Sequence, residues 1–279
     1  MATIAALLRE ASSEIGSESA RIDAELLLGF VLEKNSAWFI AHGDDELHPT
    51  VQAKFLELLQ RRKAGEPVAH IIGSRGFWTL DLAVTADTLI PRSETELLVE
   101  LAISKFSPDK KLRILDLGTG TGAIALAMAS ECKNSEVVAV DKSANALAVA
   151  IENARTNHLR VEFIQSDWFA GLQNRKFDLI VSNPPYIPSN DPHLSLGDLR
   201  FEPLSALVSG SDGLDDIRLI VSQSQKHCLP HAWLMIEHGF DQGEAVRGLF
   251  FEAGFVHVET VRDLEHRDRV TVGQWAEMP

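Results

Sequence analysis

The sequence is short of cysteine, of long apolar runs and of positive charge, and each shortage excludes a class of protein. Cys132 and Cys228 are the only cysteines among 279 residues, too few for a disulfide framework. No apolar run approaches the length of a membrane span. The start, MATIAALLREASSEIG, lacks a basic leader, and Arg9 and Glu10 interrupt its apolar residues, unlike a signal peptide. We therefore expect a cytoplasmic protein with no membrane contact.

Lysine and arginine are outnumbered by acidic residues. The chain holds 26 Lys and Arg against 40 Asp and Glu, a formal net charge of −14. Binding to nucleic acids at physiological salt depends on basic side chains that displace counterions from phosphates. Direct binding to long DNA or RNA is therefore disfavoured, although a small basic patch remains compatible with this charge. The cysteines and histidines show no CxxC or HExxH spacing, so we expect no metal.

Two regions follow one another along the chain, as expected at roughly 150 residues per domain. ARIDAELLLGFVLE and TVQAKFLELLQRRK have helical periodicity and predict a small helical bundle over residues 1–74. FWTLDLAV is strand-like, so residues 75–92 are expected to form a linking β-hairpin. The next helix is predicted to begin with a capping box between Ser93 and Glu96, before ELLVELAI.

Beyond the linker, strands and helices alternate over residues 93–279. The strands are apolar runs of the kind that is buried in a parallel sheet: LRILDL, EVVAVD, VEFIQ, FDLIVS, WLMIEH, VHVETV and RVTVGQW. Only RDLEHRD separates the last two, which is too short for a helical crossover. We predict an α/β fold whose seven-stranded, mostly parallel sheet ends in an antiparallel hairpin.

A glycine-rich turn follows the first of these strands. Its residues, which precede the helix-forming AIALAMASE, are Asp116, Leu117, Gly118, Thr119, Gly120, Thr121 and Gly122. Such glycines let a ligand approach the backbone at the carboxyl edge of the sheet, and Asp141, at the end of the second strand, can accept both hydroxyls of a ribose. Together they predict an adenosine-type ligand. The glycines alone also fit a nicotinamide cofactor or a plain strand-to-helix turn.

The ends of the third and fourth strands belong to the same edge. Asp167 and Trp168 end the third strand, and Asn183-Pro184-Pro185-Tyr186 ends the fourth, so all should line one crevice. Asp167 is expected to bond an adenine amino group and Trp168 to pack on its ring. A turn-forming aspartate and a core tryptophan are the alternative.

The NPPY stretch holds the only tyrosine of the chain, Tyr186. A planar nitrogen is a poor nucleophile because its lone pair is delocalised. If the Asn183 side-chain oxygen and the Pro184 carbonyl accept its two N–H groups, the lone pair is held toward an electrophilic methyl group. Pro185 stiffens the loop, and Tyr186 offers a flat face on which a planar group can stack. An Asn-Pro turn that merely ends a strand is the alternative.

These features resemble the class I S-adenosylmethionine-dependent methyltransferases, and within them the HemK/PrmC family. The similarity covers nearly the whole chain, through GEPVAHIIG, FWTLDLAV, TLIPRSETE, ILDLGTGTGAIALA, SDWF, VSNPPYI and RFEPLSAL. The resemblance implies methyl transfer from S-adenosyl-L-methionine, leaving S-adenosyl-L-homocysteine, to the glutamine amide N5 in the Gly-Gly-Gln loop of peptide chain release factors. It implies a helical N-terminal domain that helps to recruit this partner.

The resemblance also assigns residues. It implies cofactor contacts by Asp116, Gly118 to Gly122, Asp141 and Trp168, and a substrate clamp formed by Asn183, Pro184, Pro185 and Tyr186. Asn183, Pro184 and Tyr186 are the expected catalytic residues, with Asn183 also at the cofactor. Arg92 and Glu202 are candidate substrate-binding residues, with ordinary surface side chains as the alternative. His238 is expected to be structural. We expect a monomer.

Three other functions remain open at this point. NPPY chemistry also serves adenine N6 methylation, but a nucleic-acid methyltransferase needs base extrusion and a basic cleft, which the charge of −14 disfavours. A catalytically silent module that binds the cofactor and regulates an assembly would retain that binding after Asn183→Ala. A nicotinamide oxidoreductase is the remaining alternative, and NADH fluorescence would reveal it.

Overall fold

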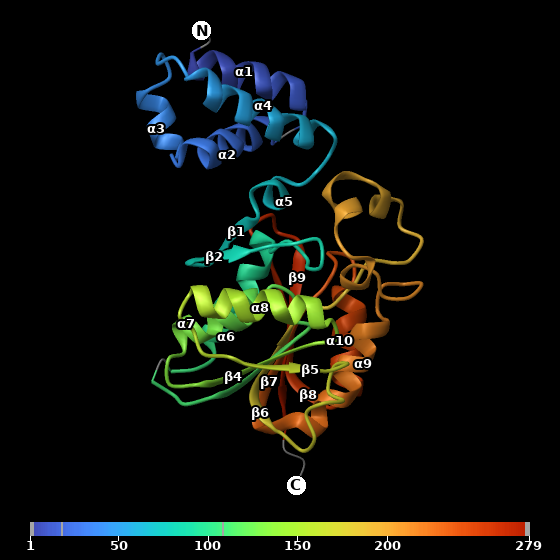
Figure 1. The fold of residues 1–279 in the computed structure, drawn as a ribbon. Helices are drawn as coiled ribbons and strands as arrows, with labels where there is room; N and C mark the ends of the chain where they lie inside the picture. The colour runs from blue at the N-terminus through green and yellow to red at the C-terminus, as the bar shows by residue number, and fades with distance from the viewer. Residues whose placement is uncertain (1–2, 18, 108, 277–279) are drawn as a thin grey trace. The chain divides into compact units, whose positions relative to one another are not determined.

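The computed structural model forms two compact units, traced in Figure 1. One unit comprises Met1–Ser74 and His193–Phe201, and the other comprises Arg75–Pro192 and Glu202–Pro279. The structure describes every residue except 1–2, 18, 108 and 277–279. The first unit therefore includes a short segment that follows the NPPY stretch in sequence.

The first unit is helical, as its periodicity predicts. Its helices are α1 (Ile4–Ile15), α2 (Ala20–Leu32), α3 (Ser36–Ala41), α4 (Pro49–Lys63) and α5 (Val68–Ile72). Leu8, Leu27 and Phe55 are fully buried in a shared core. The hydroxyl of Thr3 accepts the backbone N–H of Ala6 and caps α1. Burial of one face of each helix is what stabilises helices this short.

An arginine ties the segment 193–201 to the helices of the first unit. Arg62 of α4 donates to Asp23 of α2 at 2.8 Å and to Asp198 at 2.9 Å. The Arg62 side chain is only 13% exposed, so both carboxylates compensate the cost of burying its charge.

The short 3-10 turns of the chain are η1 (Ser93–Thr95), η2 (Pro192–Ser195), η3 (Gly197–Phe201), η4 (Leu204–Ala206) and η5 (Gln225–His227).

The predicted hairpin is present, but the predicted capping box is wrong. Strands β1 (Ser74–Phe77) and β2 (Leu80–Ala83) pair in a two-stranded sheet. The 3-10 turn η1 precedes α6 (Glu96–Ser104), whose N-terminus has no side-chain cap. Glu96 instead accepts the backbone N–H of Trp78 at 2.8 Å. The Glu96 carboxylate, which a capping box would use as its acceptor, is thus bonded to the hairpin turn, where Trp78 has φ +57°.

All seven predicted strands are present in one sheet of the second unit. They are β3 (Arg113–Leu117), β4 (Glu136–Asp141), β5 (Glu162–Gln165), β6 (Phe177–Ser182), β7 (Cys228–Glu237), β8 (Phe255–Arg262) and β9 (Asp268–Trp275). The strand order is β5-β4-β3-β6-β7-β9-β8. β9 runs antiparallel to both of its neighbours, and the pairs from β5 to β7 are parallel. The prediction of a terminal antiparallel hairpin is confirmed.

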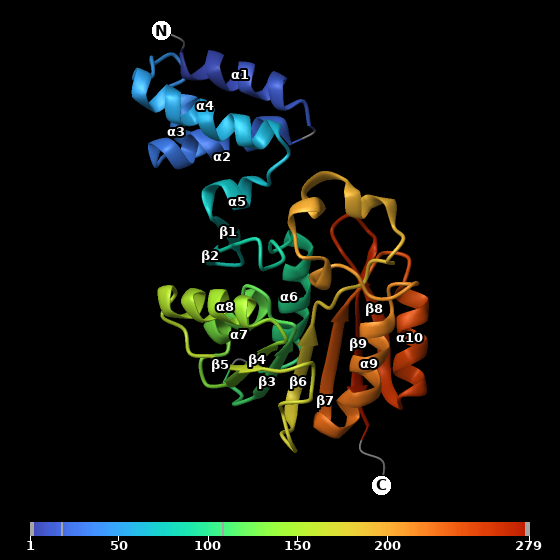
Figure 2. The same cartoon turned by 45° about the vertical axis from the view of Figure 1, so that its right-hand side comes forward.

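Helices cover both faces of this sheet (Figure 2). They are α6, α7 (Ala123–Glu131), α8 (Ala144–Thr156), α9 (Asp215–Ser224) and α10 (Gly243–Glu252). Side chains of β3 alternate between two cores: Ile114 packs with α6 and α7, and Leu115 packs with α9 and α10. Successive residues of a strand point to opposite faces, so an unbroken apolar run fits a sheet that is covered on both sides.

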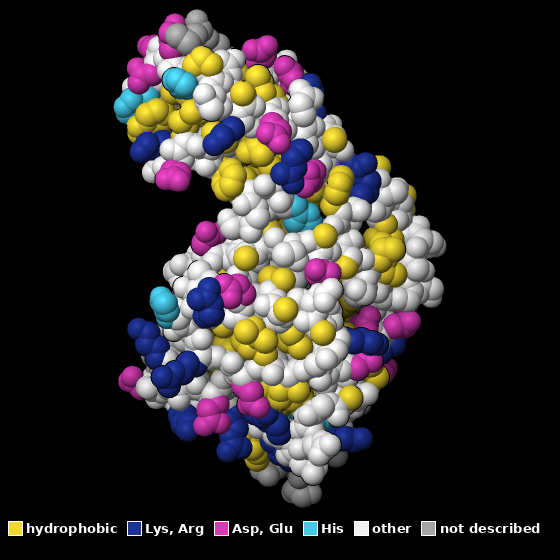
Figure 3. Space-filling view, viewed as in Figure 1, with side chains coloured by type: hydrophobic (Ala, Val, Ile, Leu, Met, Phe, Trp, Pro, Cys, Tyr) yellow, Lys and Arg dark blue, Asp and Glu magenta, His cyan; other side chains and the backbone are white. Residues whose placement is uncertain are grey.

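Acidic and basic side chains are interspersed over the face shown in Figure 3. Such mixing is typical of an ordinary protein surface. Within the described part of the chain, none of the helices combines the length and the apolar character that crossing a membrane requires.

Candidate functional site

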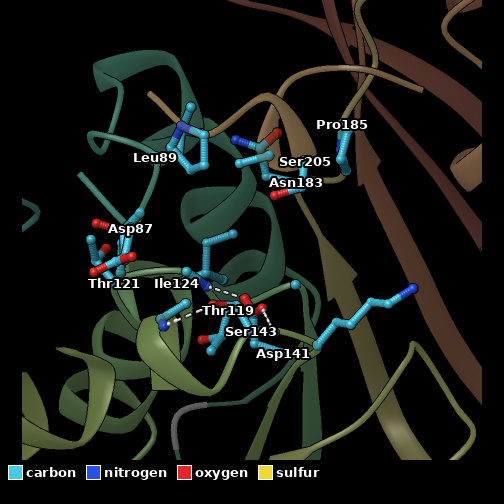
Figure 4. Close-up of a pocket in the computed structure, with 18 of the residues that line it drawn as sticks. Asp87, Leu89, Thr119, Thr121, Ile124, Asp141, Ser143, Asn183, Pro185 and Ser205 are labelled. Carbon is cyan, nitrogen blue, oxygen red and sulfur yellow. Dashed lines mark hydrogen bonds between the residues drawn. The ribbon is translucent and has the colours of Figure 1, made fainter. Parts of the chain in front are cut away.

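One cavity of about 470 Å³ lies in the second unit, at the carboxyl ends of β3, β4 and β6. Ligands of open α/β sheets bind at this edge, and the volume lies within the range of small-molecule sites. Figure 4 shows the cavity. Ten of the residues predicted for the site line it: Arg92, Gly118, Thr119, Gly120, Thr121, Asp141, Asp167, Trp168, Asn183 and Pro185. The other predicted residues, Asp116, Gly122, Pro184, Tyr186 and Glu202, lie outside this lining.

The glycine turn is held in shape by Asp141, as Figure 4 shows. One carboxylate oxygen of Asp141 accepts the N–H of Gly120 at 2.9 Å, and the other accepts the N–H of Ser143 at 2.8 Å. Gly120 has φ +55°, in the left-handed region that favours glycine. A Cβ built at Gly120 would meet nothing within 4 Å. The turn therefore presents open backbone to the cavity beside an acidic side chain.

Asp116 lies beneath the turn and is 0% exposed. Its Oδ2 accepts the Thr119 hydroxyl at 2.6 Å and the N–H of Ala125 at 3.2 Å. Burial raises the pKa of Asp116 to about 7, against the opposing effect of these hydrogen bonds. Among the described residues, Oδ1 has no hydrogen-bond partner. A buried acceptor without a partner, directly under the turn, is suited to a donor on a ligand.

Trp168 packs against the glycine turn in an unusual backbone conformation. Its φ is +47°, which is rare for a residue with a bulky side chain. A Cβ at Gly118 would lie 3.2 Å from the indole ring, so the glycine makes this approach possible. The indole N–H donates to Asp216 of α9 at 3.2 Å. The neighbouring Asp167 is exposed and forms an ion pair with Lys142 at 2.7 Å.

The side-chain amide of Asn183 is oriented by a buried hydroxyl. Asn183 Nδ2 donates to Thr95 Oγ1 at 3.1 Å, and Thr95 is only 4% exposed. Since the amide nitrogen is turned to Thr95, Oδ1 is the acceptor that Asn183 retains for a ligand in the cavity it lines. Figure 4 places Asn183 beside Pro185 and Ser205 on one wall.

Tyr186 reaches into a buried polar cluster behind this wall. Its hydroxyl donates to Glu237 Oε1 at 3.3 Å, and burial raises the pKa of the phenol. Glu237, at the end of β7, is 1% exposed. Burial raises the pKa of Glu237 to about 7, although the Thr95 hydroxyl, Arg269 and the Tyr186 hydroxyl act in the opposite direction. The phenol therefore remains protonated and can donate at physiological pH.

Arg92 and Glu202 form an ion pair at the cavity wall. The Arg92 guanidinium donates to Glu202 Oε1, and Glu202 Oε2 accepts the N–H of Ile90 at 3.4 Å. The Glu202 side chain is fully buried, whereas that of Arg92 is 33% exposed. Only Arg92 therefore faces the cavity directly. His238 is buried, and its ring nitrogens lie 2.8 Å from the Gly239 carbonyl and the Thr271 hydroxyl, which fits a structural role.

Several residues near the site were missed by sequence reasoning. Thr95 was taken as part of a helix start, and Glu237 as the end of an apolar strand. Asp87, Ser143 and Ser205 line the cavity without belonging to any motif. An acidic residue at the carboxyl end of a strand, as in WLMIEH, is the one signal that could have found Glu237. Among the residues described, no cluster of His, Cys, Asp or Glu is arranged to hold a metal ion.

Family models match both parts of the chain. The model described as the PrmC N-terminal domain matches residues 4–73, and that of the methyltransferase small domain matches residues 93–198. The chain is 50% identical over 270 residues to the release factor glutamine methyltransferase of Xylella fastidiosa, covering 96% of this chain and 97% of that one. It is 48% identical over 272 residues to the protein of the same name from Escherichia coli, again covering 96% and 97%.

Solved structures share the fold at lower identity. A methyltransferase from Pyrococcus furiosus superimposes with a TM-score of 0.54 at 15% identity, covering 78% of this chain and 98% of that one. The 16S rRNA methyltransferase RsmC of T. thermophilus, solved with AdoMet and guanosine, gives a TM-score of 0.51 at 19% identity, covering 72% and 49%. Both similarities show the class I methyltransferase fold of the second unit.

Proposed function

Since the chain belongs to the release factor glutamine methyltransferase family, we propose that it methylates the side-chain amide N5 of glutamine in the Gly-Gly-Gln motif of class 1 peptide chain release factors. The methyl donor is S-adenosyl-L-methionine, which supplies an electrophilic methyl group on its sulfonium. The observation that carries the proposal is the orientation of Asn183, whose Nδ2 is bound to Thr95 at 3.1 Å.

The NPPY stretch gives the amide of the substrate its geometry. An amide nitrogen carries two N–H donors, and Asn183 Oδ1 and the Pro184 carbonyl are two acceptors from successive residues. A substrate nitrogen held by both acceptors presents its lone pair in one direction. Because the reacting atoms are then already oriented, the rate of methyl transfer rises. Both prolines restrict the backbone, so the acceptors are positioned before the substrate arrives. Tyr186, which lies outside the cavity lining, supports the loop from behind through the bond of its hydroxyl to Glu237 at 3.3 Å.

The donor half of the cavity fits an adenosine-type methyl donor. The glycine turn leaves open space above Gly120, and Asp141 stands at the end of β4, where an acidic side chain can bind ribose hydroxyls. Asp116 Oδ1 is a buried acceptor with no partner among the described residues, suited to an amino group. The Trp168 indole, brought against Gly118, offers a ring for the adenine to pack on.

The first unit is proposed to recruit the release factor. The match of residues 4–73 to the PrmC N-terminal domain supports this role. On this proposal residues 1–74 act as the recruiting domain, 75–92 as the linking hairpin and 93–279 as the transferase domain. Arg92 and Glu202, paired at the cavity wall, are proposed to contact the substrate loop, with Arg92 as the direct contact. Exposed Ile22, Leu26 and Phe30 on α2 give this unit apolar surface for a protein partner.

The experiment is a methyl-transfer assay with labelled S-adenosyl-L-methionine and three acceptors. They are a purified release factor, the same factor with its loop glutamine changed to alanine, and an adenine-containing duplex. We expect label on the intact factor alone. Label on the duplex alone would instead establish the adenine methyltransferase, the other substrate for which NPPY chemistry is suited. Cofactor binding with no label on any acceptor would leave only a silent binding module.

A further inference from the structure

A buried polar network lies behind the NPPY stretch, and its members Thr95 and Asn183 also line the cavity. It joins three elements: η1 through Thr95, the end of β6 and its loop through Asn183 and Tyr186, and the end of β7 through Glu237. Thr95 accepts the Asn183 amide N–H at 3.1 Å, and Glu237 accepts the Tyr186 hydroxyl at 3.3 Å. Asn183 and Tyr186 are therefore both fixed by hydrogen bonds to residues of neighbouring elements.

The network decides which way the Asn183 amide faces. The two ends of an asparagine amide have nearly the same shape, so only hydrogen bonds select between them. A carboxyl oxygen that carries no proton is an acceptor only, and the Thr95 hydroxyl lowers the pKa of the Glu237 carboxyl by hydrogen bonding to it, against the larger effect of burial. A hydroxyl that donates its hydrogen to Glu237 turns a lone pair to Asn183. Thr95 Oγ1 then accepts a hydrogen bond from Asn183 Nδ2 and has no hydrogen left to donate to Asn183 Oδ1.

We propose that Thr95 is a positioning residue for methyl transfer, with Glu237 as its anchor: the two fix the Asn183 amide so that Oδ1, rather than Nδ2, meets the substrate nitrogen. This inference rests on the proposed function and deepens it. A flipped amide would place two N–H groups opposite the two N–H groups of the substrate, and the clamp would repel the group it must hold.

The surroundings of Glu237 support an anchoring role. The carboxyl is 1% exposed, and among the described residues its Oε2 has no partner at hydrogen-bond geometry. Its charged neighbours are Arg269 on β9, which favours the ionised form, and Glu94 on η1, which opposes it. A buried acceptor without a partner is costly to retain. The other oxygen, Oε1, accepts the Tyr186 hydroxyl at 3.3 Å, and the Thr95 hydroxyl lies close enough to lower the pKa of the carboxyl, so Glu237 is placed to hold both hydroxyls.

The test compares Thr95→Val with Thr95→Ser. Valine keeps the shape and removes the hydroxyl, whereas serine keeps the hydroxyl. We expect Thr95→Val to lower kcat roughly tenfold to hundredfold, because the amide loses the bond that selects its orientation. The Kd of S-adenosyl-L-methionine should change less than about twofold, because the proposed cofactor contacts are the glycine turn, Asp141 and Trp168 rather than Thr95. Thr95→Ser should restore most of kcat.

A second readout is independent of turnover. The Asn183 side-chain amide signals can be assigned in a nitrogen-15 NMR spectrum as those lost in Asn183→Ala. We expect slow hydrogen exchange of this amide in the unmodified protein and in Thr95→Ser, and fast exchange in Thr95→Val. Ser224→Ala is the matched control, because it removes a buried hydroxyl that bonds only the Val221 carbonyl of its own helix. It should change neither kcat nor the exchange of Asn183.

The two proposals fail in different ways. If the unmodified protein transfers no methyl group to a release factor, the proposed function is wrong, while the exchange measurement still tests the orientation of Asn183. If transfer occurs but Thr95→Val keeps its kcat and its protected amide, or if serine performs no better than valine, Thr95 does not position Asn183. An equal loss of kcat in Ser224→Ala would show a general effect of removing a buried hydroxyl, and the inference would be overturned.

Discussion

Asn183 has two polar side-chain atoms, and Thr95 engages one of them at 3.1 Å. Asp141 has two carboxylate oxygens, and the backbone N–H groups of Gly120 and Ser143 bond one each. On the proposed function, the two residues serve different steps: Asn183 keeps an acceptor for the group that reacts, whereas Asp141 shapes the turn over which the cofactor binds. Substitution of Asn183 should therefore lower kcat, whereas substitution of Asp141 should weaken the binding of S-adenosyl-L-methionine.

Asn183→Ala should lower kcat by roughly hundredfold or more, because an interaction that orients the reacting nitrogen matters mostly in the transition state. The Kd of S-adenosyl-L-methionine, measured by titration calorimetry, should stay within about twofold. Asn157→Ala is the control, since that amide bonds only the carbonyls of Asp81 and Asn153. A nearly unchanged kcat in Asn183→Ala would remove the clamp from the mechanism.

Asp141→Ala should instead weaken cofactor binding by roughly tenfold to hundredfold, because it removes a charged acceptor and leaves the N–H groups of Gly120 and Ser143 without a partner. Asp178→Ala is the matched control. Asp178 accepts the N–H of Arg113 at 2.8 Å, at the opposite ends of the strands. Calorimetric titration of both variants gives the comparison, and an unchanged Kd in Asp141→Ala would mean that the ribose site lies elsewhere.

At the scale of elements, the loop that follows β6 is held against a glycine. Gly213 has φ +77°, and a Cβ there would lie 2.2 Å from the Tyr186 carbonyl oxygen, which is a backbone atom. No side chain fits without displacing the NPPY loop. The shape of the NPPY loop thus depends on Gly213, which lies much later in the sequence and approaches the backbone of Tyr186.

Gly213→Ala should lower kcat by roughly tenfold or more, because a displacement of about 1 Å at the clamp is enough to reduce the rate strongly. Gly73→Ala is its control: Gly73 has φ +78°, and a Cβ there would meet nothing within 4 Å. Both variants should lose on the order of 1 kcal/mol of folding stability from backbone strain, and Gly213→Ala should lose more because its Cβ also meets the Tyr186 carbonyl. Methyl-transfer kinetics and denaturant unfolding are measured for both variants. Equal kcat values would show that Gly213 does not control the position of the NPPY loop.

The elements were largely predictable from the sequence, for a physical reason. The apolar runs of β3, β4 and β6 mark strands because a sheet covered on both faces buries nearly all of their residues. Their carboxyl ends share an edge, so the glycine turn, Asp141 and Asn183 could be placed together. The capping box failed because Glu96 found its partner, Trp78, in another element. Thr95 and Glu237 were missed for the same reason, since their partners are distant in sequence.

At the scale of the whole molecule, two buried carboxyls couple folding to pH. Burial raises the pKa of Asp116 and of Glu237 to about 7, above the values of about 4 that such groups have when unfolded. A raised pKa means that the folded state favours the neutral form. Its stabilising contribution is present below about pH 4 and is lost as the pH rises through about 7.

Asp116→Asn should therefore become more stable relative to the unmodified protein as the pH rises from about 5 to about 8, by on the order of 3 kcal/mol. Glu237→Gln should behave in the same way. Urea unfolding at several pH values measures the difference between each variant and the parent, so that the other ionisable groups cancel. A difference independent of pH would mean that the two carboxyls are ionised in the folded protein.

The net charge of −14 concerns the whole molecule as well. It disfavours nucleic acid as the methyl acceptor. On the proposed function, the exposed apolar side chains of α2 and the cavity-lining Arg92 contact a protein acceptor. The acceptor is therefore expected to be a folded protein whose loop enters the cavity.

The most direct test of methyl transfer is mass spectrometry of a release factor after incubation with the protein and S-adenosyl-L-methionine. We predict one added methyl group, located by fragmentation on the glutamine side chain of the Gly-Gly-Gln loop, and its absence with Asn183→Ala. A methyl group on another residue, or on the loop glutamine at an equal rate with Asn183→Ala, would contradict this prediction.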